Sequence, residues 1–313
     1  MTFSFANRPD YDHLPNKGRF WEWGPPGSHK EALGKLNLPS SEVVAGLPLP
    51  TASEIKTGER VGLGWEFHNL DHSPFKRTPY QMNIVPVCPG SFDDEYHINP
   101  QQSSQWDGFT NFFSQGSCRP CYQTDRIGIH HWANQDIVGR GVLIDQKQGR
   151  ADVEGINYSS FENYAIPLSQ VLEVIEYYKV EIEPGDILFL RIGLIDEWNA
   201  MALSKRTEYQ DTPLPFYTGI EETEEVLRWI WNNHFTAVAS DAVCFEILLP
   251  QNEQFFLHHN LLTGWGAPIG EIFDLDALSE VCRRLNRFSF FVASIPFNAV
   301  GEVSSPPNAV ANF

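Results

Sequence analysis

Four polar side chains between residues 101 and 111 have types and spacing that could do chemistry. Gln101, Gln105, Asp107 and Asn111 are separated by even numbers of residues, so in an extended chain they project from one face. Asp107 can bind a hard cation or act as a general base. The three amides can hydrogen-bond a substrate but carry no proton at neutral pH. The segment therefore predicts a site that orients a substrate around one carboxylate.

A second group of candidates lies near the C-terminus. His258 and His259 are adjacent in an apolar stretch, and Glu271 follows the glycine- and proline-containing turn Gly264–Gly270. Neighbours on a helix point about 100° apart, so only one of the two histidines can face a given site. A histidine and a carboxylate brought together by this turn could ligate a metal or act as base and acid. A buried histidine bonded to the main chain and a helix-capping glutamate are the simpler alternative.

Two other patterns carry weaker signals. Cys118 and Cys121 have the spacing of a zinc or redox pair. No second CxxC or histidine pair follows them at ligand spacing, so we expect no metal there. His130, Trp132 and Arg140 surround the entrance to a strand-like run. They are either a substrate-facing loop or ordinary residues at the start of a strand.

Two charged residues lie within or at the end of apolar runs. Arg191 lies inside the run Asp186–Gly193, where an unpaired charge is costly, so we expect it to have a carboxylate partner. Asp241 ends the run Thr236–Asp241 and is either a site residue or a helix cap.

The elements that must position these residues alternate along the second half of the chain. Apolar strand-like runs alternate with amphipathic helices that are expected to start near Pro167, Thr218 and Asp274 or Asp276. This order predicts an α/β protein with a partly parallel sheet. Residues 1–60 are rich in proline, glycine and tryptophan, and predict irregular chain wrapped on one catalytic domain of residues 61–313.

Composition excludes several classes of function. The net charge of −18 over 313 residues argues against nucleic acid and anionic membranes as partners. The sequence contains no run of about 18 apolar residues and no secretory signal at its start. Five cysteines fit a reducing compartment better than a disulfide framework, so we expect a soluble cytoplasmic protein. No dinucleotide fingerprint, Walker loop or GxSxG elbow is present.

Several segments, in order, resemble a known family. Gly139–Asp145, Pro184–Gly193 and His258–Glu271 resemble the cyclase family that includes bacterial kynurenine formamidase. The segments that are similar to a subgroup common in fungi are Leu33–Leu38, Glu54–Arg60, Gln105–Gly108, Ile127–Trp132 and Ser304–Ala311. The resemblance runs from about residue 10 to the C-terminus. It implies a swivelling β/β/α fold, in which helices flank a central mixed sheet, and a homodimer or larger oligomer.

The resemblance also implies which residues form the site. Metal-dependent members carry a His-x-Gly-Thr-His-x-Asp strand, a further histidine four residues on, and a distant histidine and glutamate. Placed on Asp107, the three strand histidines fall on Gln101, Gln105 and Asn111. The distant pair falls on His258 and Glu271, with one extra residue between them that leaves His259 as the alternative. Amides bind transition metals poorly, so we expect no cofactor. Zinc or manganese at Asp107, His258 and Glu271 is the alternative.

These features lead to one main hypothesis about function. We expect an enzyme of specialised metabolism that guides ring formation in a small carbonyl-rich substrate by cyclisation, dehydration or pericyclic closure. Asp107, His258 and Glu271 would supply acid–base catalysis, and Gln101, Gln105 and Asn111 would hold substrate oxygens. Trp106, His130 and Trp132 would form walls, and Arg140 would contact substrate. The alternatives are a metal-dependent amide or lactone hydrolase and a non-catalytic small-molecule binding protein.

Overall fold

The computed structural model describes residues 8–17, 23–40, 43–44, 51–70, 75, 77–111, 125–213 and 215–313. The cysteine pair Cys118 and Cys121 lies outside these residues. None of the helices in the described part of the chain combines the length and the apolar character needed to cross a bilayer.

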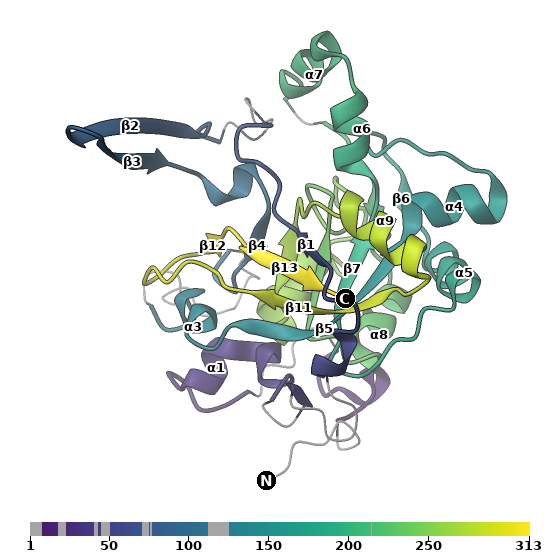
Figure 1. Ribbon diagram of the computed structural model, residues 1–313. Helices are drawn as coiled ribbons and strands as arrows, with labels where there is room; N and C mark the ends of the chain where they lie inside the picture. Colours follow the sequence, from purple (N-terminus) through teal and green to yellow (C-terminus); the bar gives the residue numbers. More distant parts are fainter. Residues whose placement is uncertain are drawn as a thin grey trace.

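Nine strands of the described chain form one mixed sheet (Figure 1). In order across the sheet they are β1 (Arg60–Gly62), β13 (Ala309–Asn312), β11 (Ser289–Ser294), β5 (Ile137–Asp145), β7 (Ile187–Arg191), β9 (Ala237–Ser240), β10 (Ile269–Glu271), β4 (Gln105–Asp107) and β12 (Ser304–Ser305). The four strands from β5 to β10 are parallel to one another, and the pairs on either side are antiparallel. The expected α/β class with a central mixed sheet is confirmed.

Helices connect these strands and flank the sheet (Figure 1). They are α1 (His29–Leu33), α3 (His130–Ala133), α4 (Gln146–Glu154), α5 (Leu168–Tyr178), α6 (Leu194–Ala200), α7 (Leu203–Gln210), α8 (Glu224–Asn232) and α9 (Asp276–Leu285). The helix expected from Thr218 begins instead at Glu224, where the side chain of Thr223 accepts the N–H of Val226. The intervening β8 (Gly219–Ile220) pairs with β6 (Ala165–Ile166), so this part of the chain is extended.

The described part of residues 1–60 is irregular chain with several short helical turns. Besides α1 it contains the 3-10 turns η2 (Tyr11–His13), η3 (Gly34–Asn37) and η4 (Thr51–Glu54). Tyr11 and Trp23 are buried, and the Trp23 indole donates to the carbonyl of Trp265 at 2.9 Å. The division into a wrapped segment and a catalytic domain stays a prediction.

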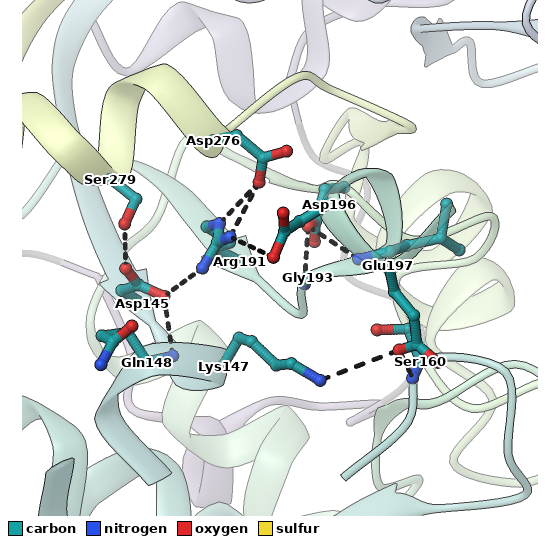
Figure 2. A network of polar contacts seen from close by, with 12 residues as sticks. Asp145, Lys147, Gln148, Ser160, Arg191, Gly193, Asp196, Glu197, Asp276 and Ser279 are labelled. Carbon is teal, nitrogen blue, oxygen red and sulfur yellow. Dashed lines mark hydrogen bonds and ion pairs between the residues drawn. The ribbon is translucent and has the colours of Figure 1, made fainter. Parts of the chain in front are cut away.

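A charged network joins the carboxyl ends of β5 and β7 to α9, as Figure 2 shows. Arg191 donates to Asp145 at 3.1 Å and to Asp276 at 2.8 Å. Asp145 is completely buried, and it also accepts a hydrogen bond from the hydroxyl of Ser279. The carboxylate partner expected for Arg191 is confirmed, and the network ties two strands to a helix.

Asp241 acts as a helix cap. Its buried carboxylate accepts the N–H groups of Ile192, Gly193 and Leu194 at 2.6, 2.7 and 3.2 Å. These groups lie at the start of α6, where main-chain donors have no partner within the helix. Asp241 therefore fixes the loop after β7 against the loop after β9, and the second loop leads into the site described below.

A hairpin projects from the body of the protein (Figure 1). It consists of β2 (Gln81–Cys88) and β3 (Ser91–His97), and nearly all of its residues are exposed. The register places the side chains of four large apolar residues on one side, which we call the apolar face of the hairpin: Met82, Ile84, Phe92 and Tyr96. Each is at least 46% exposed. An isolated two-stranded hairpin is only marginally stable in water, and an exposed apolar face of this kind is typical of surfaces that bind another protein.

His234 makes the stability of the fold depend on pH. Burial, with smaller contributions from Lys35 and Arg8, lowers the pKa of His234 to about 4. The unfolded chain takes up its proton near pH 6.5, before the folded protein does, so stability is lost as the pH falls from about 6.5 to about 4. After a discount for partial exposure we expect a loss of about 1 kcal/mol. Urea unfolding at pH 7.5 and pH 5 should show a smaller pH effect in His234→Gln, whereas the exposed His13→Gln should behave as wild type.

Candidate active site

Strand pairing brings the two distant parts of the site together. β4 and β10 are antiparallel, with Gln105 opposite Glu271 and Asp107 opposite Ile269. Gln105 and Asp107 share a face of β4, so both side chains lie beside Glu271. All three are buried, with exposures of 0% for Gln105, 2% for Asp107 and 2% for Glu271.

His258 completes this group. It immediately precedes the π-helix η7 (His259–Trp265), a helix type that is rare and frequent at functional sites. Its Nε2 lies 3.1 Å from Oε1 of Glu271 and 3.7 Å from Oδ2 of Asp107. His259 instead contacts the ring of Phe256 edge-on. Of the two adjacent histidines, His258 is the one that faces the carboxylates.

The two glutamines bridge these carboxylates. Gln101 donates its amide N–H to Oδ1 of Asp107 at 2.5 Å. Gln105 donates to Oε2 of Glu271 at 2.6 Å and to Oε1 of Gln101 at 3.1 Å. With His258, these side chains form a closed circuit of polar contacts, which we call the polar cluster: Gln101, Gln105, Asp107, His258 and Glu271. Each carboxylate therefore has one oxygen held by an amide and the other turned toward His258.

Two residues that the sequence did not single out hold the polar cluster from outside. Glu246 accepts from Nδ1 of His258 at 2.6 Å and from its main-chain N–H at 3.0 Å. Arg77 donates to the carbonyl and to the amide oxygen of Gln101 at 2.7 and 2.9 Å. Neither residue belongs to a motif or a periodic pattern, so no signal in the sequence identifies them.

The charges of the polar cluster shift the ionisation of its members. Burial, followed by the nearby carboxylate of Asp107, raises the pKa of Glu271 to about 7. Burial alone would lower the pKa of His258, but Glu246, Asp107 and Glu271 outweigh it and raise that pKa well above its usual value. Near neutral pH the cluster therefore pairs an imidazolium with a carboxyl group that readily gains or loses a proton.

Two predicted wall residues lie in the hydrophobic core. Trp106 points to the opposite face of β4 from Gln105 and Asp107, where it contacts Phe273 and donates to the hydroxyl of Ser294 at 2.9 Å. Trp132 is fully buried and packs edge-on against Phe109. The alternation that groups the polar residues of β4 also directs Trp106 away from them.

The remaining predicted site residues have other contacts. Arg140 pairs with Asp186 at 2.6 Å and with Glu54 at 3.1 Å, near the amino end of β7 and away from the end where Glu271 lies. His130 begins α3, and its Nδ1 accepts the N–H of Gly301 at 3.3 Å. Asn111 donates its main-chain N–H to Gly108 in a turn after β4. The structure thus brings together five of the ten predicted residues.

The polar cluster has the composition of a metal site. Among the described residues, ligand atoms of Asp107, His258 and Glu271 lie within 4.8 Å of one another. Two carboxylates and an imidazole suit zinc or manganese. The glutamine amides on the outer carboxylate oxygens and Glu246 on Nδ1 match the outer hydrogen bonds that usually orient metal ligands. The donor set therefore fits a divalent cation, and the expected lack of a cofactor stays a prediction.

Comparisons with known proteins give a consistent result. The profile of the family described as "Putative cyclase" matches residues 46–247. A crystal structure described as a novel cyclase is 25% identical, with a TM-score of 0.77, and the match covers 93% of this chain and 99% of that one. A search of curated proteins found no match.

Two more distant structures share the fold. Isatin hydrolase A from Labrenzia aggregata, bound to benzyl benzoate, is 15% identical with a TM-score of 0.59, and the match covers 86% of this chain and 97% of that chain. Isatin hydrolase A from Ralstonia solanacearum is 11% identical with a TM-score of 0.58, and covers 81% of this chain and 91% of its own.

Proposed function

Because the chain belongs to the cyclase family and is an enzyme, we propose that it closes a ring in a small carbonyl-rich substrate by proton transfer at the polar cluster. The observation that carries this proposal is the closed circuit of Gln101, Gln105, Asp107, His258 and Glu271. The amide nitrogen of Gln101 carries a second hydrogen besides the one it gives to Asp107, which suits a substrate carbonyl oxygen, and Oε1 of Gln105 is a buried acceptor with no partner in the described part of the chain.

In this mechanism Glu271 acts as the base and His258 stabilises the negative charge that forms. Glu271 removes a proton from the carbon beside a substrate carbonyl, and the imidazolium of His258 donates a hydrogen bond to the enolate oxygen that forms. The enolate carbon then attacks a second carbonyl of the same molecule, which closes the ring and leaves an alkoxide. Glu271 returns its proton to that oxygen, so the step is balanced without an oxidant or reductant. Loss of water gives the unsaturated ring.

Simple diketones test this proposal. Heptane-2,6-dione can close to 3-methylcyclohex-2-enone with loss of water, and the enone absorbs in the ultraviolet. We expect wild-type protein to accelerate ring closure, or deuterium uptake beside the carbonyl in heavy water, for members of a panel of such diketones and diketo acids. If the protein accelerates neither ring closure nor deuterium uptake for any member of the panel, the proposal is contradicted.

A metal-dependent hydrolase is the second candidate, favoured by the fitting donor set of Asp107, His258 and Glu271 and by the fold shared with isatin hydrolases. A divalent cation bound by these residues would polarise a carbonyl oxygen toward attack. Ring opening of isatin, followed by absorbance in chelator-treated protein and after zinc or manganese is added back, separates the two candidates. Stoichiometric metal together with isatin hydrolysis would favour the hydrolase.

Turnover of the diketone probes is expected to rise with pH and to level off above about pH 7. Glu271 must be ionised to act as a base, and its pKa is raised to about 7 by burial and by Asp107. Glu271→Gln should reduce turnover by about two to four orders of magnitude and remove the inflection. A pH–rate profile checks this, and an unchanged inflection in Glu271→Gln would assign the titration to another group.

The apolar face of the hairpin is expected to contact a second copy of the chain. Ile84 and Phe92 are 60% and 63% exposed, and burying two such side chains contributes about 3–6 kcal/mol. The double variant Ile84→Asp and Phe92→Asp should therefore weaken self-association at least about 100-fold. Light scattering over a concentration series measures this, with Asn83→Asp on the opposite face as a control. A monomeric wild type would contradict the expected dimer or larger oligomer.

A further inference from the structure

We infer that Glu246 is a positioning residue, whose carboxylate fixes the imidazole of His258 so that Nε2 faces Asp107 and Glu271. The inference rests on the proposed function, because it concerns the same polar cluster. It does not depend on whether Nε2 carries a proton or binds a metal, since both uses require the same orientation of the imidazole.

One oxygen of Glu246 receives two hydrogen bonds from the same residue. Oε1 accepts the main-chain N–H of His258 at 3.0 Å and Nδ1 at 2.6 Å. Because backbone and side chain converge on one atom, the side-chain torsions of His258 have little freedom. The carboxylate also requires hydrogen on Nδ1, since an ionised carboxylate can only accept. The ring of Phe256 stacks on the imidazole, with centroids 5.3 Å apart and planes at 15°, and restrains it from a second direction.

Among the residues that the structure describes, the carboxylate of Glu246 bonds His258 alone. Its side chain is completely buried, and its other oxygen, Oε2, has no partner among the described residues. Both hydrogen bonds to its carboxylate given by the described residues therefore come from His258. Burying a carboxylate costs free energy unless hydrogen bonds from a partner replace its lost hydration. The buried positions of Glu246 and His258 therefore depend on each other. A carboxylate with a general structural role would be expected to bond several segments, as Asp145 does with Gln148, Arg191 and Ser279.

The backbone at Glu246 is held in place by β8. Ile220 donates its N–H to the carbonyl of Phe245 at 3.3 Å and accepts the N–H of Ile247 at 3.0 Å, so the chain on both sides of Glu246 is tied to one residue. This close approach requires glycine at position 219, where a Cβ would lie 2.2 Å from the carbonyl carbon of Glu246. The position of the carboxylate is therefore set by the sheet and transmitted to the imidazole.

The test is the state of the imidazole itself. A two-bond ¹H–¹⁵N spectrum of labelled protein reports which ring nitrogen of His258 carries hydrogen. We expect hydrogen on Nδ1 in wild type, and averaged signals from a free imidazole in Glu246→Ala. Glu246→Gln keeps an amide oxygen that can accept both N–H groups, so it should retain the wild-type pattern in part. The control is Glu222→Gln, another buried carboxylate that accepts two main-chain N–H groups but bonds Gln251 and Asn252 instead.

A second measurement follows binding rather than spectra. Zinc affinity, measured against a competing dye, should fall about 10–100-fold in Glu246→Ala and less in Glu246→Gln, as for other carboxylates that orient a metal-ligating histidine. Wild-type spectra together with unchanged zinc affinity in Glu246→Ala would overturn the inference. Should the alanine variant not fold, a change in neither the spectra nor the zinc affinity of Glu246→Gln would overturn it, because the amide is expected to retain the wild-type pattern only in part. Neither readout uses a substrate, so the inference can fail while His258 remains essential for ring closure, and the reverse also holds.

Discussion

Replacing His258 by asparagine is expected to lower turnover of the diketone probes by about two to four orders of magnitude, while the protein stays folded. The imidazole contacts both Glu271 and Asp107, so its loss removes the group that stabilises the enolate. It also removes the positive charge between two carboxylates. Asparagine places its amide nitrogen about where Nδ1 of the imidazole lies, so it can still donate to Glu246.

Steady-state kinetics on heptane-2,6-dione, with circular dichroism as a check on folding, measure this effect. His259→Asn provides a matched control at the next position, because that imidazole contacts Phe256 and not the carboxylates. The control should retain activity within a few-fold. Equal losses in the two variants would show that the effect is structural, and full activity in His258→Asn would remove the proposed mechanism.

Replacing Arg191 by methionine is expected to destabilise the fold by about 3–5 kcal/mol. The substitution leaves Asp145, which is completely buried, without its cationic partner. It also releases α9, because Asp276 loses its two hydrogen bonds to the guanidinium (Figure 2). Methionine fills a similar volume, so the loss is electrostatic rather than a cavity.

Urea unfolding measures this difference in the free energy of unfolding between wild type and Arg191→Met. The comparison requires that the dependence of that free energy on urea concentration is the same in both proteins. Arg284→Met is the control, since Arg284 pairs with Glu59 at the surface with 55% of its side chain exposed, and it should lower the free energy of unfolding far less than Arg191→Met does. Adding Asp145→Asn to Arg191→Met should recover part of the loss, because an amide is cheaper to bury than a charge. A loss below about 1 kcal/mol in the single variant would mean that Asp145 finds another partner.

The sequence predicted one side of the site well. Even spacing placed Gln105 and Asp107 on one face, and the strand confirms it. Gln101 lies in the 3-10 turn Pro100–Gln102 rather than in the strand, yet its amide still reaches Asp107. The even spacing therefore correctly placed Gln101 beside Asp107, although the chain is not extended at Gln101.

The sequence could not predict residues that act through distant contacts. Glu246 reaches His258 because β8 holds the backbone of Glu246. Arg77 precedes the hairpin in the chain and bonds Gln101, which follows it. Trp132 and Arg140 were expected either in a substrate-facing loop or as ordinary residues at the start of a strand. They lie in α3 and β5, where the core and an ion pair with Asp186 account for them. A local sequence pattern indicates which residues lie on the same face of a strand or helix. It does not indicate which distant segment of the chain packs against that face.

The near-complete burial of the polar cluster has a consequence for kinetics. Gln101 is half-buried, but the other four side chains retain little contact with water, with 3% exposure for His258 and 2% for Glu271. A substrate can reach them only after part of the surrounding chain opens, and such openings have their own free energy. Association should then be far slower than diffusional encounter and should saturate at a rate set by the opening. An enzyme of this kind excludes bulk water from its intermediates at the expense of speed.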